Sequence, residues 1–254
     1  MKRALPLLVA LFLLTGCFEI DQTIRLEKNL SGTADFHLGV NFEPMVTIMA
    51  QFARDMEGKT GPLTAADIEK AKADFRKNTK KSSSEKPSLA EMKKSMPEGI
   101  ELLDFQAKEG DFRIDSDFKF GFKKLQNLVG VKLPSKEGGD PTQKNVVDTP
   151  FDGLELVEKG DTITIRTKPV NPAEAVKEEA KDAPKMDAAA EKLMRDAFKD
   201  LRVTYRITAP FTVVSHNATR REGNTLVWEY TMDRFEELSK KSADELGVRV
   251  TYRR

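Results

Sequence analysis

Runs of alternating apolar and polar residues recur in pairs along this chain, and a short turn sequence separates the two runs of each pair. The pairs occupy residues 18–27 with 34–41, 100–105 with 112–122, and 151–157 with 162–167. A period of two residues is typical of half-buried strands, and two such runs across a turn predict a β-hairpin. The hairpins predict an antiparallel β-sheet that further strands in the last third of the chain complete.

Helical spacing predicts amphipathic helices between the hairpins. Met45, Met49, Phe52 and Met56 share one face of a helix predicted at residues 43–57. A Thr-x-x-Asp capping pattern begins a more polar helix at Thr64, and Asp187 begins another that runs to about residue 199. We therefore expect an α+β fold, with an antiparallel β-sheet built from hairpins and amphipathic helices packed on one face.

The N-terminus has the layout of a bacterial lipoprotein signal. Lys2 and Arg3 precede an apolar run of about 11 residues, which is shorter than the roughly 20 residues that a transmembrane helix needs. Leu14-Thr15-Gly16-Cys17 then places a small residue directly before the only cysteine of the chain. This sequence resembles a lipobox. We expect residues 1–16 to be a signal peptide that is cleaved between Gly16 and Cys17, and Cys17 to be acylated.

Acylation of Cys17 would hold the protein at a membrane. One acyl chain gives only marginal binding, whereas two or three chains attach a protein durably. In lipoproteins of two-membrane bacteria, an aspartate after the cysteine is the usual signal for the inner membrane, and this chain has Phe18 there. We expect a lipid-anchored protein of the cell envelope, which faces the periplasm from the outer membrane if its host has two membranes.

Three polar stretches interrupt the predicted elements, near residues 78–90, 134–149 and 169–185. They are rich in charged residues, and such a composition buries little apolar surface. We expect residues 17–254 to form a single α+β domain in which these stretches are inserts.

Composition argues against several functional classes. The chain has 42 basic and 41 acidic residues, so it has no basic field for nucleic acid. An acylated Cys17 would leave no thiol for a disulfide, a metal or a nucleophile. His37 and His216 lie on separate predicted strands without a neighbouring Cys or His. We therefore expect no metal site and no cofactor.

Asp115 and Asp117 raise the question of paired catalytic carboxylates. They are two residues apart on a predicted strand, which places both side chains on one face. The polar face of a half-buried strand has the same spacing, so we favour a solvated outer face. The sequence contains no Gly-x-Ser-x-Gly elbow, phosphate loop or dinucleotide motif. We do not expect an enzyme.

Three segments resemble the LppM-like family of bacterial lipoproteins. They are the lipobox with its adjoining Ser-Gly hairpin, the Phe-rich strand ending in Gly121-Phe122-Lys-Lys-Leu125, and residues 209–218 followed by Asn224-Thr-Leu226-Val-Trp228. The resemblance implies an α+β domain on an antiparallel sheet. For some relatives it also implies an interaction with envelope lipids or glycolipids.

Two non-catalytic functions fit these features. The first is a membrane-anchored binding module for a lipid, a glycolipid or an apolar ligand, whose candidate ligand face is Met45, Met49, Phe52 and Met56. A Met-rich helix face is an adaptable binding surface, but it can also pack into a core. The second is a structural or adaptor lipoprotein whose polar inserts dock an envelope protein. A hydrolase, the third class, would need a Ser or Asp within reach of His216.

Overall fold

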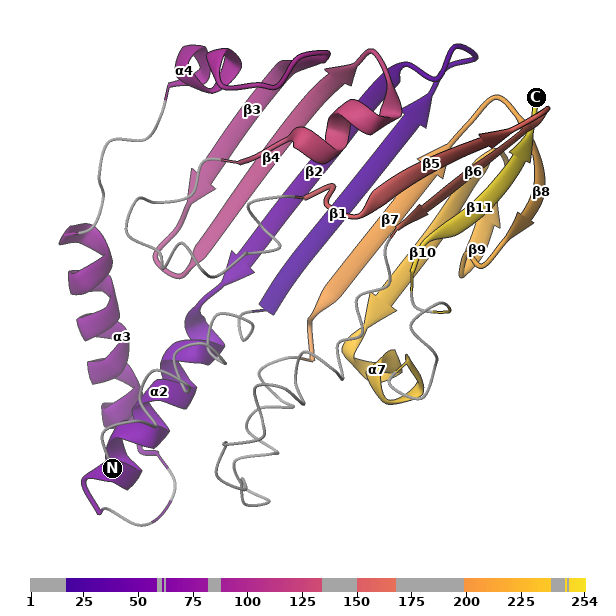
Figure 1. Cartoon of the computed structure of the whole chain (residues 1–254). Coiled ribbons are helices and arrows are strands. Elements are labelled where there is room, and N and C mark those ends of the chain that lie inside the picture. The colour runs from indigo at the N-terminus through magenta and orange to yellow at the C-terminus, as the bar shows by residue number, and fades with distance from the viewer. Residues whose placement is uncertain are drawn as a thin grey trace.

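A computed structural model gives the fold of the chain (Figure 1). It describes residues 17–58, 61, 63–81, 88–133, 150–167, 199–238, 245 and 247–254. Within these residues the fold is α+β, as predicted, with a seven-stranded sheet, a four-stranded sheet and helices beside them.

The seven-stranded sheet has the strand order β3-β4-β2-β1-β7-β10-β9. Its strands are β1 (Cys17–Leu26), β2 (Gly32–Asn41), β3 (Ile100–Glu109), β4 (Arg113–Phe122), β7 (Arg202–Thr208), β9 (Arg220–Glu222) and β10 (Thr225–Thr231). The first two predicted hairpins are confirmed as the antiparallel pairs β1–β2 and β3–β4. Strand β2 also pairs with β4, so the two hairpins form one continuous surface.

Strands β1 and β7 pair in parallel, with Glu19 opposite Arg202 and Arg25 opposite Thr208. This pair brings the first strand beside the last third of the chain. Alternation along a sequence predicts that a run is a strand, but it does not predict which distant strand lies beside it. The parallel pairing was therefore not part of the predicted antiparallel sheet.

The four-stranded sheet has the order β5-β6-β11-β8. Its strands are β5 (Leu154–Lys159), β6 (Thr162–Thr167), β8 (Thr212–His216) and β11 (Arg249–Arg253). The sequence pattern predicts one sheet, whereas the last third of the chain is divided between two. Pro210 lies where the chain passes from β7 to β8. Proline has no N–H for a sheet ladder, so a strand seldom continues through it.

The hydrophobic core joins the two sheets. Its large buried side chains include Phe36, Phe120, Ile207 and Trp228 from the seven-stranded sheet, and Ile163, Ile165, Val250 and Tyr252 from the four-stranded sheet. The short helix α4 (Leu89–Lys94) and the 3₁₀-helix η1 (Leu125–Gly130) add Met92, Leu125 and Leu128 to the same cluster. These two helices therefore pack on the apolar side of the sheets.

Asn217, directly after β8, connects the two sheets through its side-chain amide. The indole Nε1 of Trp228 donates a hydrogen bond to Asn217 Oδ1 at 2.7 Å, and the Arg249 N–H donates to the same oxygen at 2.9 Å. The Asn217 Nδ2 donates to the Gly247 carbonyl at 2.6 Å. Trp228 belongs to β10 and Arg249 to β11. One side chain thus holds a strand of each sheet.

Helices α2 (Glu43–Met56) and α3 (Ala65–Lys81) lie side by side beyond the end of β2 (Figure 1). The predicted cap of α3 is confirmed, because the Asp67 N–H donates to Thr64 Oγ1 at 3.2 Å and the Thr64 N–H donates to Asp67 Oδ2 at 3.0 Å. Helix α7 (Met232–Leu238) follows β10. Among the described helices, none is long and apolar enough to cross a membrane.

Several predicted segments lie outside the described residues. They are the signal peptide at 1–16, the inserts at 134–149 and 169–185, and the helix predicted from Asp187. The insert near 78–90 is described only at its two ends.

Candidate functional site

Cys17, the predicted lipidation site, is the first residue of β1 and lies opposite Asn41, the last residue of β2. Gly16, on the other side of the predicted cleavage site, lies outside the described residues. The sheet therefore begins directly at the residue that would carry the lipid.

Helix α2 starts at this same end of the sheet (Figure 1). Its first residue, Glu43, follows Asn41 by two positions, and the Glu43 N–H donates a hydrogen bond to Asn41 Oδ1 at 3.1 Å. This bond satisfies one of the N–H groups that the first turn of a helix leaves unpaired. Pro44 fits that turn because it has no N–H to satisfy. Since neighbouring strands are about 5 Å apart, α2 begins close to Cys17.

The candidate ligand face of α2 lies largely at the surface. Met49 and Met56 are 50% and 74% exposed. Met45 and Phe52, on the same face, are half-buried. The side chains that α2 buries fully are Val46 and Ile48, which lie on either side of this face. Of the two roles that the sequence leaves open, packing into the core does not apply to Met49 and Met56.

An aromatic stack holds α3 at this end of the sheet. Phe75 of α3 lies between Phe42 and Phe112, with ring centroids 5.7 Å away on each side. The Arg76 guanidinium lies 4.7 Å from the centroid of the Phe112 ring, and its Nε donates to Asp111 at 3.0 Å. This role of Phe75 was not predicted, because Phe75 is an isolated aromatic residue in a polar helix.

Ion pairs then join α2 to α3. The Lys72 Nζ lies 2.6 Å from a Glu43 carboxylate oxygen, and the Arg54 Nη1 donates to Asp67 at 2.6 Å. The ion pair with Glu43 raises the pKa of Lys72, and hydrogen bonds from Thr64 lower the pKa of Asp67. The exposed methionines are therefore carried by a braced pair of helices.

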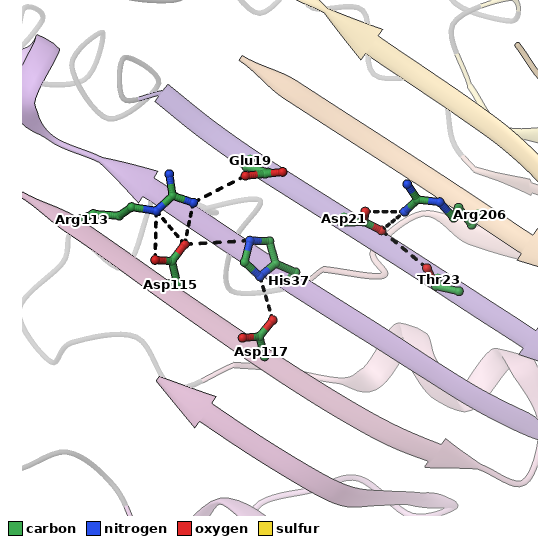
Figure 2. Close-up of polar contacts among 8 residues, drawn as sticks. All are labelled: Glu19, Asp21, Thr23, His37, Arg113, Asp115, Asp117 and Arg206. Carbon is green, nitrogen blue, oxygen red and sulfur yellow. Dashed lines mark hydrogen bonds and ion pairs between the residues drawn. The ribbon is translucent and has the colours of Figure 1, made fainter. Parts of the chain in front are cut away.

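A second candidate site lies on the outer, polar face of the seven-stranded sheet (Figure 2). The Arg113 Nε donates to both carboxylate oxygens of Asp115 at 2.9 Å, and its Nη2 lies 3.5 Å from Glu19. His37 Nδ1 lies 2.7 Å from Asp117, and its Nε2 lies 4.0 Å from Asp115. Three strands, β1, β2 and β4, bring these five side chains together.

A neighbouring ion pair extends this polar face across the parallel strands (Figure 2). Arg206 of β7 donates to both carboxylate oxygens of Asp21 on β1. Thr23 lies beside the pair, with its hydroxyl 3.5 Å from Asp21 Oδ1. The pair connects residues from opposite ends of the chain, so it stabilises the β1–β7 register.

The contacts of this network favour a structural role for its carboxylates over a catalytic one. A general acid needs a raised pKa, whereas the Arg113 guanidinium holds the pKa of Asp115 below its usual range. Asp115 and Asp117 lie on the solvated face, as predicted. The contacts of His37 were not predicted, because Asp117 is 80 residues away along the chain. His216 Nδ1 accepts a hydrogen bond from the Ala218 N–H at 3.1 Å.

Metal binding finds no support in this part of the chain. Among the described residues, no three His, Cys, Asp or Glu side chains are grouped as a metal site would require. The carboxylates around His37 are instead engaged by Arg113 and by the imidazole.

The chain was compared with protein-family models, curated proteins and solved structures. No protein-family model matches the chain, and no curated protein matches it. The chain is similar to the NMR structure of the folded domain of LppM from Mycobacterium tuberculosis, with a TM-score of 0.43 and 10% sequence identity. The similarity covers 94% of this chain and 89% of that one. At this identity, function has to be inferred from the residues of this chain.

Proposed function

We propose that this chain is a lipid-anchored protein of the bacterial cell envelope that binds a lipid, a glycolipid or another apolar ligand and catalyses no reaction. The ligand binds to the face of α2 that includes Met49 and Met56. The observation that carries the proposal is the exposure of these two methionines at the end of the sheet where Cys17 lies. If the host has two membranes, the protein faces the periplasm from the outer one.

The two exposed methionines supply part of the binding free energy that a retained ligand needs. Full burial of a Met side chain contributes about 1.5–3 kcal/mol, so covering the exposed parts of Met49 and Met56 would contribute about 2–4 kcal/mol. An affinity of 1 mM corresponds to about 4 kcal/mol, so these contacts alone bind weakly. Retention of a ligand by a chain without the anchor therefore needs further contacts, and the half-buried Met45 and Phe52 of the same face can supply them.

Native mass spectrometry tests the proposal. The chain is purified as residues 17–254 with Cys17→Ser, which removes the anchor, and whatever co-purifies is extracted with organic solvent. A lipid or glycolipid retained at one molecule per chain supports the proposal. A clean protein mass, together with capture of one stoichiometric protein partner, would overturn it and favour an adaptor lipoprotein.

A pair of variants assigns the ligand to α2. The double variant Met49→Ser, Met56→Ser should lose the retained lipid, because it removes the two most exposed apolar side chains of the face. Val214→Ser is the matched control, since Val214 on β8 is 48% exposed. The control should keep the lipid. Equal retention by the double variant and the control would show that the ligand binds elsewhere.

A further inference from the structure

We propose that the α2 face rests on the surface of the membrane that holds the Cys17 lipid, with Met49 and Met56 inserted at the level of the lipid headgroups. This inference rests on the proposed function, since it takes Cys17 as acylated and α2 as the apolar binding face. It goes further by naming the ligand as a lipid surface. A single lipid molecule held by the protein is the competing ligand.

The first support is the position of the face relative to the anchor. Cys17 pairs with Asn41, and α2 begins two residues later. An α-helix rises 1.5 Å per residue, so Met49 lies about 9 Å and Met56 about 20 Å along the axis from Glu43. Cys17 is itself part of β1, so the sheet end stays near the bilayer. The membrane is then the largest apolar phase within reach of these side chains.

The second support is the bracing of α2 in the described structure. Its first turn is tied to Asn41 and to Lys72, and its last turn is tied through Arg54 to Asp67. Phe75 anchors the partner helix α3 to the end of the sheet. Because α2 is already held in place, its docking on a surface immobilises few further rotatable bonds, so the loss of conformational entropy on binding is small.

The third support is the charge of the neighbouring helix. Helix α3 has three acidic and six basic residues, and the basic ones are Lys70, Lys72, Arg76, Lys77, Lys80 and Lys81. Of these, Lys72 pairs with Glu43 and Arg76 with Asp111. Lys70 and Lys77 are exposed. Basic residues beside an apolar helix face favour binding to surfaces with anionic lipids, because the charges attract the headgroups while the apolar side chains insert.

Exposed apolar residues also lie away from α2, so exposure alone does not mark a membrane contact. Val157 and Val214 are 46% and 48% exposed. They belong to β5 and β8 of the four-stranded sheet, away from α2 (Figure 1). Single exposed apolar side chains are common on protein surfaces. The two methionines differ because they share one helix face beside the predicted anchor.

Cys17 is the only cysteine, which allows the anchor to be rebuilt in vitro. Residues 17–254 are coupled through the Cys17 thiol to a maleimide lipid in vesicles of phosphatidylethanolamine with a minority of phosphatidylglycerol. Methionine oxidation by hydrogen peroxide is then followed by mass spectrometry, because sulfoxide formation needs access to the sulfur. The same chain coupled to a soluble maleimide is the reference.

We expect Met49 and Met56 to oxidise several-fold more slowly on the vesicles than on the soluble reference. The variant Val214→Met places a similarly exposed methionine on β8, and its oxidation rate should not change. Equal oxidation rates of Met49 and Met56 in the two preparations would overturn the inference. Equal slowing of all three methionines would also overturn it, because it would mean that the vesicle shields the whole protein.

The outcomes separate this inference from the proposed function. If the anchor-free chain retains one lipid in native mass spectrometry but the methionines gain no protection on vesicles, the proposed function stands and the membrane contact is overturned. If neither lipid retention nor protection is found, both are overturned. Protection confined to Met49 and Met56 supports the membrane contact.

Discussion

Replacing Asn217 with alanine should destabilise the protein, because this side chain bonds to both sheets. Trp228 is 1% exposed, so water cannot replace the acceptor of its indole N–H. A buried donor left without a partner costs about 1–3 kcal/mol. The hydrogen bonds of Asn217 with the Arg249 N–H and with the Gly247 carbonyl are exposed, so the loss of each would lower the free energy of unfolding by about 0.5 kcal/mol. We expect Asn217→Ala to lower the free energy of unfolding by about 2–4 kcal/mol.

Urea unfolding followed by tryptophan fluorescence measures this loss, since Trp228 is the only tryptophan. Asn217→Asp keeps an acceptor for Trp228 and for Arg249, but its second carboxylate oxygen repels the Gly247 carbonyl oxygen instead of donating to it. It should therefore recover part of the stability at neutral pH, and most of it at a pH low enough for the introduced carboxyl to be protonated and to donate to Gly247. Asn29→Ala is the matched control, because Asn29 accepts two bonds from Ser31 in an exposed turn. Its effect should be about 1 kcal/mol or less.

Two results would refute the reasoning. If Asn217→Ala costs no more than Asn29→Ala, the bonds through Asn217 do not contribute to stability. If Asn217→Asp is as unstable as Asn217→Ala at a pH low enough to protonate the introduced carboxyl, the missing acceptor is not the cause of the loss.

Three further predictions concern the core, the polar face and the helix pair. The Tyr252 hydroxyl is buried without a partner in the described part of the chain, so Tyr252→Phe should be neutral or stabilising by up to about 1 kcal/mol in urea. A clear loss would contradict this. Arg113→Met should cost about 0.5 kcal/mol at neutral pH. Because the pKa of Asp115 is lowered in the fold, this difference should disappear as the pH falls below about 4; a difference that grows in acid would be inconsistent with the pairing. Phe75→Ala should speed amide hydrogen exchange in α2 and α3 but not in β1 and β2, and uniform acceleration would argue against a local brace.

Local patterns predicted much of this fold. The hairpins at β1–β2 and β3–β4 follow from alternation across Gly-containing turns, and the Thr64–Asp67 cap follows from its spacing. These signals depend on residues close together in the chain, so they can be read without knowing the tertiary structure.

Contacts between distant segments could not be predicted in this way. The parallel β1–β7 pair, the second sheet and the carboxylates around His37 all join residues far apart in the sequence. The α2 face was predicted from its spacing, but its exposure depends on how α2 packs. Ile48, which lies outside the predicted stripe, is fully buried, whereas Met56 within the stripe is exposed.

The most direct test of a membrane-anchored binding protein is the mass of its N-terminal peptide. The full chain is expressed in a bacterium, the membrane fraction is digested, and the peptides are analysed by mass spectrometry. We predict an N-terminal peptide that begins at Cys17 and carries the added mass of a diacylglyceryl group, with or without a further acyl chain. A peptide that begins at Met1, or one in which Cys17 has a free thiol, would contradict the account.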